Sequence, residues 1–369
     1  MPCAPGGALF VRPVPRIGFG TAGLGDATER AVWLALMAGY RHIDSAQAQE
    51  WYREDAVGRA LRRATLSPPP ADQAVRATEH VMSEEGEGTE ENGSYGASAS
   101  GWGAVAGIPA TPSFSRDDVF VTTKIHPRDF EPHRLRMSVD ASRRNLNGVD
   151  LLLLHAPNCW PGSCRESPTR WQAAWRELEV MYAEGAVRAI GVSNFSDSLL
   201  RELLGMAKVM PAAVQNWMDP FHQDKAVRSL CARNGIAYVA YSTLGGQWTY
   251  RSSPPPPNPV FTDATLRSIA EGHRTSSQAV AMSWALQSGA VILPRSSDSN
   301  RIRENLRSFV GFEGADECAV NEASGGGERE EDTGREMPGT GDDGTQVISV
   351  MLSLEEMATI NGLDGILGG

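Results

Sequence analysis

Four side chains of the types that transfer protons follow short apolar runs of the chain. Asp44 and Tyr52 come after one run, Lys124 ends a second run and His155 ends a third. A carboxylate buried at such a position is costly unless it is paired or takes part in chemistry. We therefore expect Asp44 to pair with Lys124.

Together these four groups suit proton donation to a carbonyl oxygen. A free tyrosine titrates at about pH 10, and a neighbouring Lys124 ammonium would stabilise the phenolate and lower the pKa of Tyr52. Asp44 supplies the counter-charge that keeps a buried lysine protonated. His155 can hydrogen-bond a bound C=O group and orient it. The set predicts carbonyl reduction, with hydride arriving from a cofactor.

The elements that must position these groups alternate along the chain. Eight short β-branched or aliphatic runs predict strands at 16–21, 41–45, 119–124, 150–155, 188–193, 212–216, 237–242 and 290–295. The runs between them carry apolar residues at three- and four-residue spacing, which indicates amphipathic helices. Examples are 27–39, 132–147, 170–185 and 276–289. Eight such units predict an α/β fold, a (β/α)8 TIM barrel.

A doubly wound parallel sheet is the rival interpretation. Gly18, Gly20 and Gly23 have the spacing of a phosphate-binding G-x-G-x-x-G motif. No helix is expected to begin directly at Gly23, and a lone glycine pattern is weak evidence, so the eight units favour the barrel. In a barrel the carboxyl ends of the strands meet at one mouth. The polar residues at these ends are Thr21, Asp44, Lys124, His155, Ser193, Gln215, Tyr241 and Arg295.

The net charge of −11 on 369 residues is unevenly distributed. Residues 67–115 carry −6 and residues 313–349 carry −9, which leaves +4 on the rest of the chain. Both segments are rich in Gly, Ser, Glu and Pro, a composition that cannot bury enough apolar surface to offset ordering entropy. We expect a single barrel domain over residues 1–369, with these segments as disordered acidic insertions.

The composition of the chain also indicates its cellular compartment and its binding partners. No apolar run approaches the roughly 20 residues that cross a bilayer, and no long apolar segment marks a secretory signal. Five scattered cysteines suit free thiols in a reducing compartment. Cys159 and Cys164, in "NCWPGSC", could bind metal or form a disulfide, but no second ligand pair follows at zinc-site spacing. We expect a cytoplasmic protein, with organelle targeting as the alternative. We also expect it to be a monomer that binds a small molecule and no metal, nucleic acid or membrane.

Nine stretches of the sequence resemble the aldo-keto reductases. They are "GFGTAGLG", "AGYRHIDSAQ", "WYREDAVGRAL", "VFVTTKI", "VDLLLLHAP", "GAVRAIGVSNFS", "PAAVQNW", "YVAYSTLG" and "VILPRSSDSNRIRENL". "LSLEEMATINGL" is similar to the closing helix of that family. The resemblance implies a (β/α)8 barrel that reduces an aldehyde or ketone with NADPH. It also implies that Asp44, Tyr52, Lys124 and His155 are the catalytic residues.

The same resemblance implies a set of NADPH-binding residues. Ser193, Asn194 and Gln215 match those that hold the nicotinamide carboxamide, and Tyr241 matches the tyrosine that stacks on the ring. The remaining matches are Gly20 and Thr21 beneath the cofactor, Ser242 and Leu244 after Tyr241, Arg295, Ser296 and Arg301 at the 2′-phosphate, and Glu304 and Asn305 at the adenine. Two guanidinium groups with a serine suit phosphate binding.

The chain departs from the family around the predicted proton donor. Asp44 and Tyr52 are eight positions apart, where five is usual, and Ala156 replaces a frequent tryptophan after the histidine. We expect the loop "AQAQEW" to absorb the extra residues and to curl Tyr52 toward Lys124 and His155. The alternative function is a non-catalytic NADP(H)-binding regulatory partner of the same fold. The complete set of four favours the enzyme.

Overall fold

The computed structural model describes residues 14–65, 114–164, 170–250, 253–307 and 350–367. The predicted insertions 67–115 and 313–349 lie outside the described residues, except for Phe114 and Ser115. Phe114 packs against the core, and the Arg41 guanidinium lies 4.1 Å from the centre of its ring. The described barrel therefore resumes at the end of the first predicted insertion.

All eight predicted strands are present and parallel, in the order β1 to β8. They are β1 Phe19–Gly20, β2 His42–Asp44, β3 Phe120–Ile125, β4 Leu151–Leu154, β5 Ile190–Ser193, β6 Ala213–Trp217, β7 Ala237–Tyr241 and β8 Val291–Ile292. The sheet curls until its two edges meet. The Gly18 amide donates to Ile292 O (2.8 Å), the Gly20 amide donates to Pro294 O (3.0 Å), and the Ile292 amide donates to Arg16 O (2.9 Å). The predicted barrel is confirmed, and it is closed between β1 and β8.

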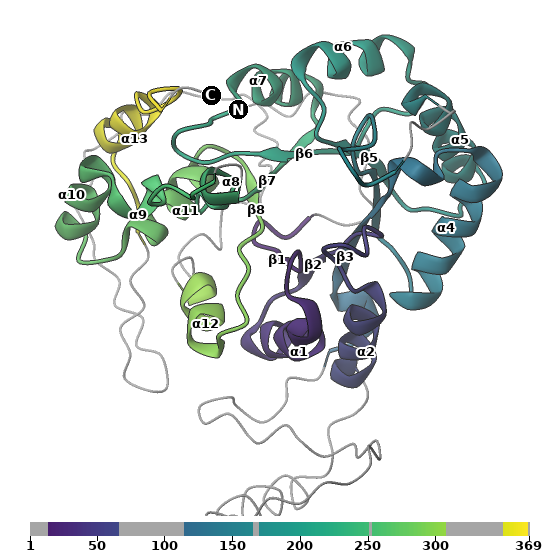
Figure 1. Cartoon of the computed structure of the whole chain (residues 1–369), viewed down its shortest axis with the longest axis horizontal. Coiled ribbons are helices and arrows are strands. Elements are labelled where there is room, and N and C mark those ends of the chain that lie inside the picture. Colours follow the sequence, from purple (N-terminus) through teal and green to yellow (C-terminus); the bar gives the residue numbers. More distant parts are fainter. Residues whose placement is uncertain (1–13, 66–113, 165–169, 251–252, 308–349, 368–369) are drawn as a thin grey trace, which may run out of the picture.

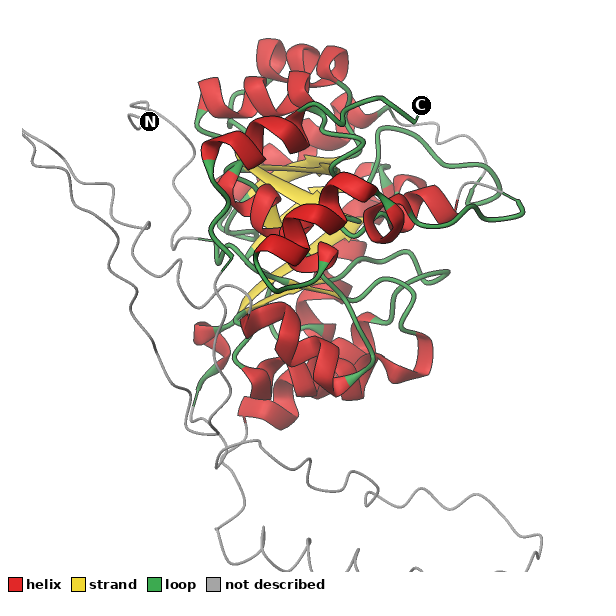
Figure 2. Cartoon of the chain, turned by 90° about the vertical axis from the view of Figure 1, so that its left-hand side faces the viewer, coloured by secondary structure: helices red, strands yellow, loops and turns green. Residues whose placement is uncertain are grey.

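Helices surround the strands, as Figure 1 and Figure 2 show. The longer ones are α1 Thr28–Ala38, α2 Glu54–Thr65, α4 Pro132–Asn145, α5 Trp171–Ala183, α6 Asp197–Met206, α7 Lys225–Asn234, α10 Ala264–Gly272, α11 Ser277–Gln287, α12 Ser299–Arg307 and α13 Leu354–Asn361. Shorter helical segments are η1 Gly25–Ala27, η2 Arg116–Asp118, η3 Pro127–Asp129, α8 Gly246–Tyr250 and α9 Pro259–Thr262. The four helices predicted in detail are observed as α1, α4, α5 and α11.

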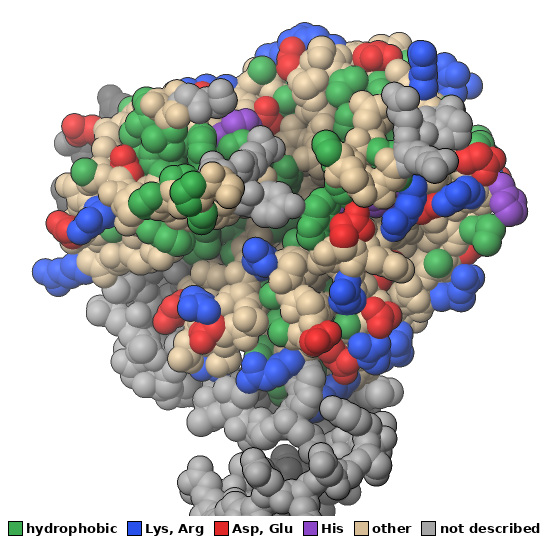
Figure 3. All heavy atoms as spheres, viewed as in Figure 1, with side chains coloured by type: hydrophobic (Ala, Val, Ile, Leu, Met, Phe, Trp, Pro, Cys, Tyr) green, Lys and Arg blue, Asp and Glu red, His purple; other side chains and the backbone are tan. Residues whose placement is uncertain are grey.

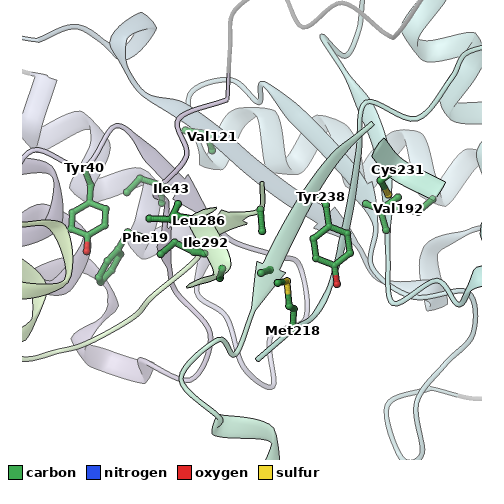
Figure 4. Packing of buried hydrophobic residues seen from close by; sticks show 14 of the residues in the cluster. Phe19, Tyr40, Ile43, Val121, Val192, Met218, Cys231, Tyr238, Leu286 and Ile292 are labelled. Carbon is green, nitrogen blue, oxygen red and sulfur yellow. The ribbon is translucent and has the colours of Figure 1, made fainter. Parts of the chain in front are cut away.

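The strands are buried on both faces. In β4, Leu151 and Leu153 belong to a cluster inside the barrel, whereas Leu152 and Leu154 belong to the larger cluster beneath the helices. Side chains alternate along a strand, so a run of four leucines fills both layers, which is typical of parallel sheets. Figure 4 shows part of the larger cluster, including Phe19. Within the described residues, no helix combines the length and apolar character needed to cross a membrane.

Candidate active site

A buried ion pair joins the ends of β2 and β3. Lys124 Nζ donates to Asp44 Oδ2 (2.7 Å) and to Ser45 O (2.9 Å), and Gln215 Nε2 donates to Asp44 Oδ1 (2.8 Å). The side chains of Lys124 and Asp44 are only 1% and 4% exposed. The three strands β2, β3 and β6 thus deliver an acid, a base and an amide to one point at the barrel mouth.

Tyr52 lies over this pair because its loop curls back. The amides of Trp51 and Tyr52 both donate to Ala48 O (2.9 Å each), so the chain turns between Ala48 and Tyr52. Lys124 Nζ lies 5.0 Å from the centre of the Tyr52 ring. The structure therefore brings Tyr52 to the Lys124–Asp44 pair despite the unusual spacing.

His155 completes the group from the end of β4. Its ring centre lies 5.9 Å from that of Tyr52, with the rings at 72°. Burial, together with the positive charges of Lys124 and His126, lowers the pKa of His155 well below its ordinary value. Its imidazole is therefore neutral at neutral pH and can donate one N–H hydrogen bond without adding a second buried cation.

The charges of the site shift two further pKa values. Burial alone would lower the pKa of Lys124, but the carboxylate of Asp44 and the phenol of Tyr52 outweigh burial and raise it. Burial raises the pKa of Tyr52, and the Lys124 ammonium opposes this rise only in part. The expected net lowering of the Tyr52 pKa is therefore wrong, because desolvation of the phenolate exceeds its attraction to the lysine.

Aromatic rings that the sequence analysis did not assign to the site lie beside His155. The Trp160 ring centre is 5.2 Å from His155, 4.4 Å from His126 and 5.1 Å from Trp51. Trp160 belongs to the segment "NCWPGSC", and a disulfide joins Cys159 to Cys164. Of the two alternatives considered for these cysteines, the structure shows the disulfide, whereas Cys231 is free and buried. A tryptophan between two close cysteines, just after a strand-end histidine, was the available signal.

The residues expected at the nicotinamide form one hydrogen-bonded group at the ends of β5, β6 and β7. Ser193 Oγ donates to Gln215 O (2.8 Å), and Asn194 Nδ2 donates to His155 O (2.8 Å). The Tyr241 hydroxyl donates to Asn194 Oδ1 (2.7 Å). Asn194 adopts a positive φ of 60°, a conformation that asparagine tolerates better than most residues. This group adjoins the Lys124–Asp44 pair through Gln215.

The expected phosphate-binding residues lie after β8 and on α12. Arg301 Nε donates to Ser296 Oγ (3.3 Å), and Arg295 Nη1 donates to Ala22 O (2.7 Å). Within the described residues, neither guanidinium has a carboxylate partner within 4.0 Å, and both are exposed. Arg301, Glu304 and Asn305 occupy one face of α12, since residues three and four apart are neighbours on a helix. Two exposed guanidinium groups on neighbouring segments fit a bound phosphate.

The other expected cofactor residues complete the rim. Gly20 is buried at the end of β1, and Thr21 Oγ1 donates to Asp44 O (2.8 Å), so Thr21 ties β1 to β2. Ser242 adopts φ 56°, and its Oγ accepts a hydrogen bond from Gln247 Nε2 (3.3 Å). Leu244 is partly buried, and its carbonyl accepts a hydrogen bond from Asn258 (2.8 Å). Figure 3 shows a hollow near the centre of one face, with hydrophobic side chains inside it.

Comparisons with known proteins identify the family of this chain. A model of the Aldo/keto reductase family matches residues 94–317. Deoxymugineic acid synthase 1 of Oryza sativa subsp. japonica is 32% identical over 313 residues, covering 81% of this chain and 83% of that protein. Glycerol 2-dehydrogenase (NADP(+)) of Hypocrea jecorina is 29% identical, covering 79% and 83%.

A solved structure shares the fold. The aldo-keto reductase of Bombyx mori in complex with NADP has a TM-score of 0.65 at 21% identity, and the match covers 96% of this chain and 90% of that one. The family and the oxidoreductase class predicted from the sequence are confirmed by the family model and the curated relatives. The chain belongs to the aldo/keto reductase family.

Proposed function

We propose that this protein reduces an aldehyde or ketone to an alcohol with NADPH, and that Tyr52 donates the proton. The observation that carries the proposal is the buried Lys124–Asp44 pair beneath Tyr52. A buried ion pair adds little to stability compared with well-packed apolar side chains, so its place at the barrel mouth favours a chemical role. When bound, NADPH supplies the hydride.

Each residue of the group has a distinct task in this reaction. The Tyr52 hydroxyl transfers its proton to the carbonyl oxygen, on which negative charge develops. The Lys124 ammonium, held by Asp44, stabilises the phenolate left behind. Because its pKa is raised, Tyr52 carries its proton at neutral pH and is ready to donate it. The neutral His155 donates a hydrogen bond to the same oxygen and orients the carbonyl group.

The exposed arginines support the choice of NADPH over NADH. Arg295 and Arg301, with Ser296, would hold the 2′-phosphate, the one group that distinguishes the two cofactors. Ser193, Asn194, Gln215 and Tyr241 would hold and cover the nicotinamide end. The Hypocrea jecorina relative, whose name specifies NADP(+), supports the same choice. We further propose a single barrel domain, acting as a cytoplasmic monomer on a small carbonyl compound.

Replacing Tyr52 by Phe tests the proposal. Loss of a general acid should lower kcat with a reactive aromatic aldehyde by about 10²-fold or more, while the Kd for NADPH stays the same. Tyr182→Phe is the matched control, because Tyr182 packs against the hydrophobic core on α5 and should keep its activity. Undiminished turnover by Tyr52→Phe would refute the assignment. NADPH binding without oxidation in the unaltered protein would favour the regulatory alternative.

A further inference from the structure

The loop after β4 is constrained at both ends. The disulfide Cys159–Cys164 closes a short ring of residues, with Cα atoms 5.8 Å apart. Inside it, the Ser163 amide donates to Trp160 O (3.0 Å), and Gly162 has φ 80°. Pro161 followed by a glycine with positive φ is typical of a type II turn. The ring and the turn together restrain the backbone that carries the Trp160 side chain.

Trp160 contacts three loops of the active site at once. Its ring meets Trp51 from the β2–α2 loop, His126 from the end of β3, and the proposed catalytic His155 from the end of β4. Trp51 and Trp160 are tilted by only 30° and both remain partly exposed. Next to a group that is proposed to bind a carbonyl oxygen, these two packed indoles offer an aromatic wall suited to an aromatic or conjugated substrate.

The disulfide and the turn restrain the loop beyond Trp160, and Ser163 Oγ also donates a hydrogen bond to Trp160 O (2.9 Å). Pro161 and Gly162 are exposed, and Cys159 and Cys164 are partly exposed, so a small thiol can reach the bridge. The wall therefore depends on a bond that a change of redox conditions can open. A reducing compartment would hold such a pair as thiols.

We propose that Trp160 determines specificity for aromatic carbonyl substrates and that the Cys159–Cys164 disulfide sets its position, so that the redox state of this loop controls substrate affinity. The proposal rests on the proposed function. Opening the bridge requires a dithiol. Its thiolate attacks one sulfur to give a mixed disulfide, and its second thiol then displaces the other sulfur. The dithiol is oxidised to its cyclic disulfide, and both cysteines are reduced to thiols, with two electrons and two protons transferred.

The test uses the full chain with Cys3→Ser and Cys318→Ser, two cysteines outside the described residues. Oxidised and dithiothreitol-reduced protein are compared, and thiol alkylation followed by mass spectrometry verifies the state of Cys159 and Cys164. KM and kcat are measured for 4-nitrobenzaldehyde and for propanal. The Kd of 4-nitrobenzaldehyde is measured by ligand-observed NMR with NADP+ present. Reduction should raise KM and Kd for the aromatic aldehyde by roughly 2- to 12-fold, the range of one aromatic pair contact, and leave propanal unchanged.

Two variants separate the loop from general effects of the reductant. Cys159→Ser with Cys164→Ser should resemble the reduced protein and should not respond to dithiothreitol. Trp160→Ala should show the same weakened binding in both redox states, with an unchanged Kd for NADPH. Equal Kd values for the aromatic aldehyde in oxidised and reduced protein would overturn the inference. A redox-dependent Kd without any turnover would instead support the loop and count against the proposed function.

Discussion

Replacing Asp44 by Asn removes the negative charge from the buried pair and leaves its shape nearly intact. Gln215 keeps an acceptor oxygen, but Lys124 loses its only carboxylate partner among the described residues and retains the Ser45 carbonyl. Both side chains are almost fully buried, and removing one partner of a buried pair costs about 3–5 kcal/mol. We expect Asp44→Asn to lower the free energy of unfolding by that amount at pH 7.

A double-mutant cycle with Lys124→Met separates the pair from the site as a whole. The doubly altered protein has no buried charge to leave uncompensated, so its stability should exceed the value obtained by adding the two single losses. Urea denaturation followed by circular dichroism gives all four free energies. Asp140→Asn is the matched control, because Asp140 forms an exposed ion pair with Arg143 at 3.7 Å. It should change the stability by about 0.5 kcal/mol or less.

The titration of Lys124 determines how the stability difference between the unaltered protein and Asp44→Asn depends on pH. In the unaltered protein its pKa is raised, so its contribution to stability is present below the ordinary lysine pKa and is lost as pH rises through the folded-state value. In Asp44→Asn, burial remains while the attraction of Asp44 is gone, so the Lys124 pKa falls below its ordinary value. The unfolded variant then binds more protons, and the variant becomes more stable as pH rises. The difference in the free energy of unfolding between the unaltered protein and Asp44→Asn should therefore become smaller between pH 7 and about pH 9.5.

Three results would refute this reasoning. A loss below about 1 kcal/mol in Asp44→Asn at pH 7 would mean that water reaches Lys124 and that the pair is not buried in solution. Additive losses in the double-mutant cycle would mean that Asp44 and Lys124 act independently. A stability difference that grows toward pH 9.5 would contradict the assigned direction of the Lys124 pKa.

Three further predictions concern the cofactor, the insertion and acid stability. Arg301→Ala should weaken NADPH binding by about 1.5–3 kcal/mol, as for a hydrogen bond to a charged group, and barely change NADH binding; equal losses in titration calorimetry would exclude a phosphate clamp. Deleting residues 68–113 should preserve the thermal unfolding transition, because α2 contacts η2 and a short linker can join them; an unfolded deletion protein would contradict this. Because the His155 pKa is lowered, stability should fall as pH drops below about 6.5, and His155→Gln should lessen that fall in urea denaturation between pH 7 and 5; an identical slope would disprove the burial argument.

The barrel was predictable because its strands are buried on both faces and therefore have continuous apolar sequences. The run Leu151–Leu154 serves two hydrophobic layers, and such a continuous apolar run is visible in the sequence. The pairing of Asp44 with Lys124 was predictable for a related reason, since both stand at strand ends that a barrel brings to one mouth. The three- and four-residue spacing of apolar residues also predicted the helices α1, α4, α5 and α11.

The features that could not be predicted from the sequence depend on loop geometry and on desolvation. The place of Trp160 beside His155 follows from a disulfide and a tight turn, and neither can be deduced from composition. The net direction of the Tyr52 pKa depends on how deeply its phenol is desolvated, a quantity that a list of neighbouring charges does not contain. The assigned roles of the site residues stay predictions that the variants above can test.

The closure between β1 and β8 has a consequence for synthesis in the cell. The Ile292 amide of β8 donates a hydrogen bond to Arg16 O, next to β1. At a translation rate of about 5–20 residues per second, synthesis of the chain from Arg16 to Ile292 takes roughly 14–55 s, during which the first strand lacks this neighbour. During that interval its outer edge has unpaired backbone groups, which attract other strands. The nascent chain is thus exposed to mispairing until its last barrel strand leaves the ribosome, so its yield should depend on chaperones that act during translation.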